Sequence, residues 1–600
     1  MPKRWIIRRY DHELAQSISR SAQISELMAV LLVERGIRTS HAANAFLNAN
    51  LREHLREPFL LPGCCEVAEH LLEAIRRQQK IVVYGDYDVD GMTGIVILRQ
   101  TLSDLGANVD YYVPSRLDEG YGLHSEAIVK LAQSGVEVII TVDCGISSIE
   151  EAKTAAEHGV KLLITDHHMP GAELPNATAI AHPQLVRLAE QYVSVQSLTP
   201  EEVKLATKYP FPSLCGSAVA LKVAWALGQL VFNGPGKPVS PQFRVRLTEM
   251  LGLAALGTVA DCVPLQDENR VLVRGGLPYL CSPKTSAGLK QLLAVSKYVE
   301  GKTRVDSEYV AFQLVPRLNA AGRLGQAGLA VELLLSNDLA QATKLAEEIN
   351  ELNESRKILE RRITKEAEQQ IHEQFDVEND PAFVLSGDWH RGVIGIVAGR
   401  LVDQFHRPVI LFGKDKMGNI PVVGSARSVS GFNLYAALQS CRQFLIRFGG
   451  HEAAAGLMID AMAIDLFRTA FCEVVAQRIT AEERIAELLI DGFFPLGAFT
   501  RPTVEQILTL APFGNSNPPP IFAANKVLVK NPRTMGKENN HFAAEFHQHG
   551  VAFRGVAFNR CNWCEEMQPY NEPIDIVFKV RISDFNNRIE LDILDWRRAT

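Results

Sequence analysis

The stretch IVVYGDYDVDGMTG, residues 81–94, contains the clearest evidence for how the first part of this chain folds. An apolar run rich in β-branched residues leads into three aspartates at alternating positions, Asp86, Asp88 and Asp90, and then into Gly91. Such a run followed by glycine predicts a buried strand that turns into a helix. One aspartate would be explained as the N-cap of that helix. Three carboxylates so close together repel one another unless a cation lies between them, so the stretch also predicts a metal site.

The alternation of strand and helix continues beyond this stretch, up to residue 168. We expect strands at 80–86, 108–115, 136–145 and 161–168, with helices at 94–106, 125–133 and 149–159. Continuously apolar strands that alternate with helices indicate an α/β fold, a parallel sheet covered on both faces. In such sheets ligands lie beyond the carboxyl ends of the strands.

Further acidic and histidine residues follow other apolar runs. Asp143 follows VEVIITV, the group Asp166, His167 and His168 follows KLLIT, and Asp261 follows LAALGTVA. If these segments converge at one edge of the sheet, carboxylates and imidazoles meet there. This ligand set suits Mn²⁺, Mg²⁺ or Zn²⁺, and several carboxylates suit two ions. A single Asp or His would more often be structural, but four clusters in the same context predict metal binding.

Composition narrows the class of protein. With 600 residues, 47% of them hydrophobic and 22% charged, the chain has the make-up of a globular protein of several domains. The net charge of −7 provides no overall attraction for a polyanion, so nucleic-acid binding would depend on local basic patches. We expect no membrane span and no secretory signal. Ten scattered cysteines fit a cytoplasmic protein, and CNWC at 561–564 is interpreted as a structural pair.

After the first domain, the type of secondary structure predicted from the sequence changes several times. Residues 184–212 predict an irregular or helical excursion, and residues 328–375 predict a long amphipathic helix that joins two domains. A dimerising coiled coil is the alternative, because apolar residues there keep heptad-like spacing. A second α/β unit follows, and short β-like segments after residue 522 predict a small barrel. The heptad-like positions are Leu345, Ile349, Leu352, Leu359 and Ile363.

Several motifs resemble a known family. GDYDVDG at 85–91, VDCG at 142–145, TDHH at 165–168 and GTVADCVPL at 257–265 resemble the four motifs of the DHH phosphoesterase superfamily. VPRLNAAGRLG at 315–325, WHRGVIGIVAGRL at 389–401, GSARS at 424–428 and FGGHEAAAG at 448–456 resemble features of its RecJ family of single-strand-specific exonucleases. APFGNSNPPPIF at 511–522 resembles the entry to the C-terminal OB domain of that family.

The resemblance implies a cage for two divalent cations, Mn²⁺ or Mg²⁺. Asp88 and Asp90 would bind separate ions and Asp143 would bridge them. His168 would face the substrate phosphate, and Asp166 would orient an imidazole. The implied reaction is two-metal hydrolysis of a phosphodiester. The remaining ligands of the cage would be His167 and Asp261, with Asp86 as a candidate for a further one.

The resemblance also implies a path for a DNA strand. Arg427 and similar arginines would hold the backbone or the 5′-terminal phosphate, which implies 5′→3′ removal of mononucleotides in DNA recombination and repair. For any single arginine, a surface salt bridge is the ordinary alternative. His451, expected at a helix start after a glycine pair, would hold another phosphate, although the glycines alone could make a tight turn. The complete set of candidate substrate-binding residues is Arg116, Arg317, Asn319, Arg323, Ser425, Arg427, Ser428, Gly449, Gly450 and His451.

The resemblance implies a division into domains. We expect an N-terminal extension at 1–55, a DHH catalytic domain at 56–325, a connecting long helix at 326–376, a DHHA1 domain at 377–475 and an OB-like domain at 476–600. One departure from the family pattern is His182 before Pro183, where relatives usually have an Asn-Pro pair. This change could alter the metal preference.

Three functions stay open. The first is the single-stranded-DNA exonuclease, with single-stranded DNA as substrate and a helicase and a single-strand-binding protein as implied partners. The second is a DHH oligonucleotidase or small-substrate phosphoesterase, which would not need the arginine motifs and the barrel. The third is a non-catalytic DNA-binding scaffold, which all the predicted metal ligands argue against. Comparing rates on a dinucleotide and on a long single strand separates the first two.

Overall fold

The structure of the chain is a computed structural model. It describes residues 3–169, 171, 173–185, 210–413, 421–480, 482–536, 538–567, 572–583 and 586–599. Most of the predicted excursion at 184–212 lies outside the described residues.

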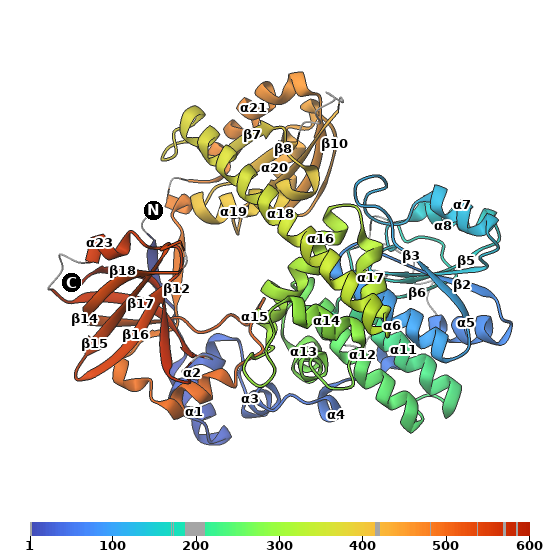
Figure 1. The fold of residues 1–600 in the computed structure, drawn as a ribbon, viewed down its shortest axis with the longest axis horizontal. Coiled ribbons are helices and arrows are strands. Elements are labelled where there is room, and N and C mark those ends of the chain that lie inside the picture. The colour runs from blue at the N-terminus through green and yellow to red at the C-terminus, as the bar shows by residue number, and fades with distance from the viewer. Residues whose placement is uncertain are drawn as a thin grey trace.

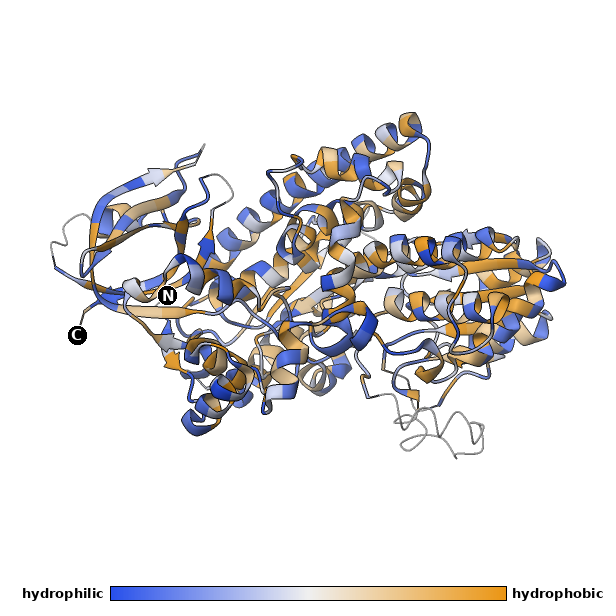
Figure 2. Cartoon of the chain, turned by 90° about the horizontal axis from the view of Figure 1, so that it is seen from below, coloured by the Kyte–Doolittle hydropathy of each residue, from blue (hydrophilic) through white to orange (hydrophobic). Residues whose placement is uncertain are grey.

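A five-stranded parallel sheet forms the first domain, in the order β3-β2-β4-β5-β6. Its inner strands are apolar and buried along nearly their whole length, as their sequences predict. Figure 2 shows hydrophobic colour along these strands. The predicted parallel-sheet domain is therefore confirmed. Its elements are β2 (Lys80–Gly85), α6 (Val89–Asp104), β3 (Asn108–Tyr112), α7 (Ser125–Gln133), β4 (Val138–Val142), α8 (Ile149–Glu157), β5 (Lys161–Thr165) and β6 (Ala179–Ala181).

Helices complete this domain. Helix α11 packs against both α5 and α6, and α12 packs against α6 and α13, so that they share one core with the sheet. These helices are α5 (Cys64–Arg76), α11 (Gly216–Phe232), α12 (Pro241–Ala260), α13 (Asp267–Leu280), α14 (Ala287–Val295), α15 (Ser307–Tyr309), α16 (Val315–Arg323) and α17 (Ala327–Leu335).

The long helix α18, Leu339–Gln374, connects the first domain to the second. Leu345 and Ile349 belong to the core of the first domain, whereas Ile363 belongs to the core of the second. The apolar stripe that the coiled-coil alternative would use is thus largely covered within the chain. The predicted helix at 326–376 is divided in the structure, because α17 ends at Leu335 before α18 begins.

The second domain contains a mixed five-stranded sheet in the order β10-β11-β9-β8-β7. Strands β7 and β8 are parallel, and the other pairs are antiparallel. Its elements are β7 (Phe383–Gly387), α19 (Arg391–Phe405), β8 (Val409–Gly413), β9 (Val422–Arg427), α20 (Leu434–Ser440), β10 (Leu445–Gly450), β11 (Ala454–Ile459) and α21 (Ile464–Arg478).

The third domain is a β-barrel, as predicted. Its strands follow the order β13-β14-β15-β16-β18-β17, and a pairing of β14 with β17 closes the barrel. Its elements are β12 (Glu487–Ile490), β13 (Gly492–Phe493), α22 (Arg501–Leu508), β14 (Phe522–Met535), β15 (His541–Gln548), β16 (Val551–Ala557), α23 (Trp563–Met567), β17 (Ile574–Ile582) and β18 (Ile589–Arg598).

The N-terminal segment packs against this barrel. Strand β1 pairs in parallel with β12, and the first helices share the core of the barrel. Figure 1 shows the three domains as separate lobes, with α1 and α2 below the barrel, α3 and α4 extending from them towards the first domain, and α18 running between the upper lobe and the first domain. None of the helices in the described part of the chain has the length and apolar composition needed to cross a membrane. The N-terminal elements are β1 (Arg4–Ile7), α1 (His12–Ala22), α2 (Glu26–Glu34), α3 (Ser40–Leu47) and α4 (Leu51–His54).

Candidate active site

The three aspartates after β2 have different surroundings. Asp88 is the N-cap of α6, because its Oδ1 accepts hydrogen bonds from the amides of Asp90 at 2.9 Å and Gly91 at 3.1 Å. Asp86 is 4% exposed, and its Oδ1 has no hydrogen-bond partner among the described residues. The ordinary capping explanation therefore accounts for Asp88 but leaves Asp86 unexplained.

Asp90 is completely buried against the start of another helix. Its Oδ2 accepts a hydrogen bond from the amide of Gly216 at 2.6 Å, and its Oδ1 accepts one from the amide of Ser217 at 2.9 Å. These amides begin α11, where the helix dipole favours negative charge. A Cβ atom at position 216 would lie 2.6 Å from the Cβ of Asp143, so glycine is needed for this close approach.

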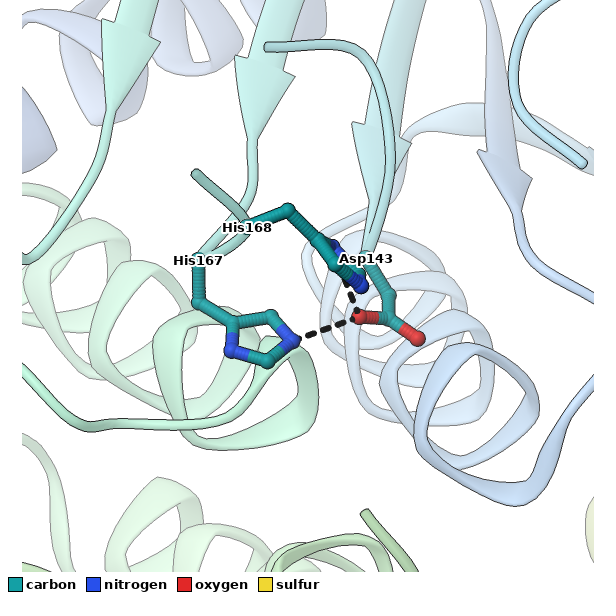
Figure 3. A group of neighbouring side chains, drawn as sticks. All are labelled: Asp143, His167 and His168. Carbon is teal, nitrogen blue, oxygen red and sulfur yellow. Dashed lines mark hydrogen bonds and ion pairs between the residues drawn. The ribbon is translucent and has the colours of Figure 1, made fainter. Parts of the chain in front are cut away.

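Asp143 lies at the end of β4, in the left-handed region with φ of 61°. This conformation is uncommon for a residue other than glycine. Its Oδ1 lies 3.0 Å from His167 Nε2 and 3.7 Å from His168 Nδ1 (Figure 3). Asp143 is 2% exposed, and its carboxylate is grouped with the two histidines and with Asp86 and Asp88.

Asp166 holds the two histidines in place through hydrogen bonds. It is completely buried, and its Oδ1 accepts hydrogen bonds from the amides of His167 and His168 and lies 2.8 Å from His168 Nδ1. Burial by itself would raise the pKa of Asp166. The hydrogen bond from His168 outweighs this effect and holds the pKa of Asp166 below its usual range. The same contact raises the pKa of His168 to about 9 against the effect of burial. Tyr121 adds a third contact, with its hydroxyl 3.0 Å from His168 Nδ1.

Asp261 comes from a helix rather than from a strand. It is the C-cap of α12, and its Oδ2 lies 3.5 Å from His167 Nε2. No described residue donates a hydrogen bond to this buried oxygen. Asp261 therefore belongs to the predicted cluster, but the packing of α12 places it there, and it does not follow a strand of the sheet.

The ligand atoms form overlapping groups of metal-binding size. In each group the atoms lie within 4.8 Å of one another. Burial and mutual repulsion raise the pKa values of the carboxyls of Asp86, Asp143 and Asp261, as expected for acids gathered around the position of a cation. Together with the unpartnered oxygens of Asp86 and Asp261, this donor set fits two divalent ions. The groups are Asp86, Asp88 and Asp143; Asp90, His167 and Asp261; and Asp143, His167 and His168.

Three predicted arginines lie together beside the acidic cluster. Burial, together with the positive charges of Arg116, Arg356 and Arg427, lowers the pKa of Arg323 to about 10. The charge of Asp88 opposes this shift. Arg323 reaches the start of α19 with a hydrogen bond from Nη1 to the carbonyl of Gly392 at 3.3 Å. Cations that are held together in this way favour an anion between them.

Residues of the second domain form the other wall of this basic cluster. Arg427 Nη1 donates to Ser425 Oγ at 3.2 Å, and both side chains lie on β9. A Cβ atom at Gly395 of α19 would lie 2.9 Å from Ser425 Oγ and 3.1 Å from Arg427 Nη2. The start of α19 therefore lies directly against the Ser425 and Arg427 side chains, where its dipole adds to the attraction for an anion.

The other candidate residues have different surroundings. The Oδ1 of Asn319 accepts a hydrogen bond from the amide of Val89 at 3.2 Å, so this residue borders the metal-binding loop. Arg317 is 5% exposed, and its guanidinium donates to Asn350 Oδ1 and to two carbonyls, which does not support a contact with a strand. Ser428 Oγ is buried and has no partner among the described residues.

The glycine pair of GGHEAAAG is not followed by a helix. Gly449 and Gly450 end β10, and His451 lies in the hairpin that leads to β11, with its amide bonded to the carbonyl of Ala454 at 2.8 Å. The predicted helix start at His451 is therefore wrong. A backbone φ of 143° at Gly450 allows this turn, and local sequence did not distinguish a hairpin from a helix start.

Comparison with known proteins agrees with this architecture. The model of the DHH family N-terminal domain matches residues 80–258, the DHHA1 domain matches 379–477 and the RecJ OB domain matches 490–595. The chain is 37% identical over 586 residues to the single-stranded-DNA-specific exonuclease RecJ of Bacillus subtilis strain 168, covering 98% of this chain and 69% of that protein. The chain belongs to the RecJ family.

Solved structures of the RecJ family have the same fold. RecJ of Thermus thermophilus in complex with Mn²⁺ superimposes with a TM-score of 0.79 at 28% identity, covering 100% of this chain and 80% of that protein. The same RecJ in complex with Mg²⁺ gives a TM-score of 0.73 at 26% identity, with 100% and 79% coverage.

Sequence reasoning missed several residues of this RecJ-family site. Tyr121 donates to the carbonyl of Asp143, and the amides at the start of α11 hold Asp90. The sequence CGSA at 215–218 was a usable hint, because small residues at a helix start allow close approach. His182 is buried, with Nε2 3.0 Å from the carbonyl of His168, so it touches the backbone of the motif and lies in none of the metal-binding groups.

Proposed function

We propose that this RecJ-family chain is a metal-dependent exonuclease that hydrolyses single-stranded DNA from the 5′ end and releases 5′-mononucleotides. The observation that carries the proposal is the contact of the arginine cluster with the aspartate loop. Arg116 lies 4.9 Å from the ring centroid of Tyr87, the residue between Asp86 and Asp88, and a Cβ atom at Gly322, next to Arg323, would lie 2.4 Å from the carbonyl oxygen of Tyr87. A metal centre next to a separate anion pocket suits a substrate with two phosphates, one that reacts and one that is held.

The metal ligands proposed here follow the groups of oxygen and nitrogen atoms. One ion would be held by Asp86, Asp88 and Asp143, and a second by Asp90, Asp143 and His167, with Asp261 completing the set. Two such ions supply charge stabilisation for both the attacking and the leaving oxygen of a phosphodiester. Oxygen-rich sites of this kind suit Mn²⁺ or Mg²⁺, the two ions named for the RecJ structures of Thermus thermophilus.

His168 is proposed to contact the reacting phosphate. Its Nδ1 is engaged by Asp166 and Tyr121, which leaves Nε2 to point away from them. The contact with Asp166 raises the pKa of His168, which favours the protonated imidazole that donates to a phosphate oxygen. Asp166 holds the ring in this orientation, as carboxylates behind catalytic imidazoles commonly do.

Arg323, Arg427 and Ser425 are proposed to hold the 5′-terminal phosphate. Holding this end beside the metal centre places the first internucleotide bond at the reacting position, which gives the 5′→3′ polarity. Backbone contacts without base readout would make the enzyme indifferent to sequence. The family resemblance adds a helicase and a single-strand-binding protein as proposed partners in recombination and repair.

The first test is digestion of single-stranded DNA labelled at either end, with Mn²⁺ or Mg²⁺. We expect immediate release of labelled mononucleotide from the 5′ end alone, loss of this activity in Asp143→Ala, and no cleavage of a blunt duplex. Cleavage of dinucleotides with long strands left intact would favour the oligonucleotidase instead. Binding without cleavage would favour the scaffold.

A second experiment tests the proposed pocket for the 5′-terminal phosphate. Arg427→Ala should raise KM for a 5′-phosphorylated strand by about ten-fold or more, because a buried charge-assisted contact is lost. It should have a smaller effect on a strand with a 5′-hydroxyl. The matched control is Arg442→Ala, an exposed arginine of the same domain. An unchanged KM for the phosphorylated strand would refute the pocket.

A further inference from the structure

Phe312 is an exposed aromatic residue at a position where the helix changes its winding. Its side chain is 70% exposed, and no other described phenylalanine is as exposed. It lies in the π-helical turn Val310–Leu314, between α15 and α16, and Val310 and Leu314 on either side are completely buried. One exposed apolar residue needs no explanation by itself, but π-helical turns occur frequently at functional sites.

The neighbours of Phe312 on the helix surface belong to the active site. The helix from Ser307 to Arg323 buries one face, and its opposite face carries the exposed Glu308 and Phe312 and the half-buried Asn319 and Arg323. Spacings of four, seven and four residues place side chains on one face of a helix. Asn319 bonds the metal-binding loop, and Arg323 belongs to the arginine cluster. Phe312 therefore lies on the same face as both, about two turns from Asn319.

The residues on this helix face follow one another in order from the proposed phosphate pocket to the barrel. Arg323 lies at the proposed pocket for the 5′-terminal phosphate, and Asn319 comes next, beside the metal-binding loop. Phe312 follows, and Glu308 at the far end lies within the electrostatic influence of Lys579 and Arg581 on barrel strand β17. A strand that is held at Arg323 and cut near Asn319 would continue past Phe312 towards the barrel.

The spacing along the helix fixes which part of the strand could reach Phe312. Eleven residues separate Phe312 from Arg323, which corresponds to roughly 16 Å along a helix axis. A strand with the spacing of a duplex covers this length with about five nucleotides, and a more extended strand needs fewer. A dinucleotide anchored at Arg323 would therefore end before Phe312.

We propose that Phe312 stacks on a base of the single-stranded DNA substrate, several nucleotides to the 3′ side of the bond that is cut. The inference rests on the proposed exonuclease function and adds a binding subsite to it. Stacking on an aromatic ring is tolerant of sequence, since every base has a π-face. An exposed ring on the path between the metal centre and the barrel would hold the strand as it advances.

The test compares kinetics of Phe312→Ala and Phe312→Trp with the wild type, on a long 5′-phosphorylated strand and on a 5′-phosphorylated dinucleotide. We expect Phe312→Ala to raise KM for the long strand on the order of ten-fold, with KM and kcat for the dinucleotide unchanged. Phe312→Trp should restore the wild-type KM. The matched control is Leu466→Ala, which removes a similarly exposed apolar side chain, 64% exposed, from α21.

A binding measurement gives an independent readout. Phe312→Trp in an Asp143→Ala background should lose fluorescence when a long single strand is added, beyond any change seen with Asp143→Ala alone. An unchanged KM of Phe312→Ala on long strands would overturn the stacking, and so would an equal defect on the dinucleotide. Failure of the wild type to cut long strands would instead overturn the proposed function.

Discussion

Asp166 accepts hydrogen bonds from the amides of Ile146, His167 and His168, and its Oδ1 also contacts His168 Nδ1. One buried carboxylate therefore fixes the loop after β4, the loop after β5 and the orientation of a histidine. It belongs to none of the metal-binding groups. Its charge and its geometry act on the proposed reaction only through His168.

We expect Asp166→Asn to lower kcat about 10- to 100-fold while KM for a long strand changes little, because the amide cannot keep His168 protonated and oriented as the carboxylate does. Steady-state kinetics on single-stranded DNA measure both constants. Asp465→Asn, a change to an 85% exposed side chain of α21, is the matched control. If thermal unfolding is unchanged and kcat is also unchanged, Asp166 has no positioning role.

At the scale of the element, α18 carries a buried polar group between its two apolar segments. Glu360 is 1% exposed and contacts Arg356 Nη1 at 2.7 Å and Arg400 Nη2 of α19 at 2.5 Å. Asn353 Oδ1 accepts from the same Arg356. The connecting helix is thereby fixed to the second domain by charge as well as by apolar packing.

Glu360→Ala should destabilise the second domain by about 3 to 5 kcal/mol, because it leaves the charge of Arg356 buried without its partner. The free energy of unfolding in urea measures this loss, followed by a probe in the second domain. Glu354→Ala removes an exposed pair with Lys357 on the same helix and should cost at most about 1 kcal/mol. Equal effects of the two substitutions would contradict the prediction.

At the scale of the whole molecule, the two ends of the chain are packed together. The fully buried Arg270 of α13 donates to the carbonyls of Phe46, Thr509 and Leu510, which joins the N-terminal segment, the first domain and the approach to the barrel. Nearby, Glu34 of α2 faces Asp491. Burial and the charge of Asp491 raise the pKa of Glu34 to about 8.

The Glu34 carboxyl predicts a pH dependence of stability. A carboxyl whose pKa is raised in the folded state favours folding fully below its unfolded pKa, near 4.5, and this contribution is lost as the pH rises through about 8. Glu34→Gln should therefore be as stable as the wild type near pH 4 and more stable by about 1 to 2 kcal/mol at pH 9, a value reduced for solvent screening. Thermal unfolding across this pH range measures the difference. A constant difference at all pH values would contradict the assignment.

Local sequence predicted the parts of the fold that local forces decide. The strands before Asp86, Asp143 and Asp166 and the helix after Asp88 are all present, because apolar runs and capping residues act over a few neighbours. The helix expected at His451 failed for the same reason, since a glycine pair permits either turn. The resemblance to the RecJ family, carried by motifs spread along the chain, is confirmed by the comparisons.

The amino-acid sequence alone shows which residues end the strands of the sheet, and their clustered charges predict a cation. Three features of the site are visible only in the folded chain: the start of α11 holds Asp90, Asp261 approaches from a helix, and Arg323 and Arg427 come together from two domains. The folded chain also shows that the N-terminal helices complete the core of the barrel. These contacts join segments far apart in the chain, and the packing of whole elements sets them, which neither residue periodicity nor local propensity encodes.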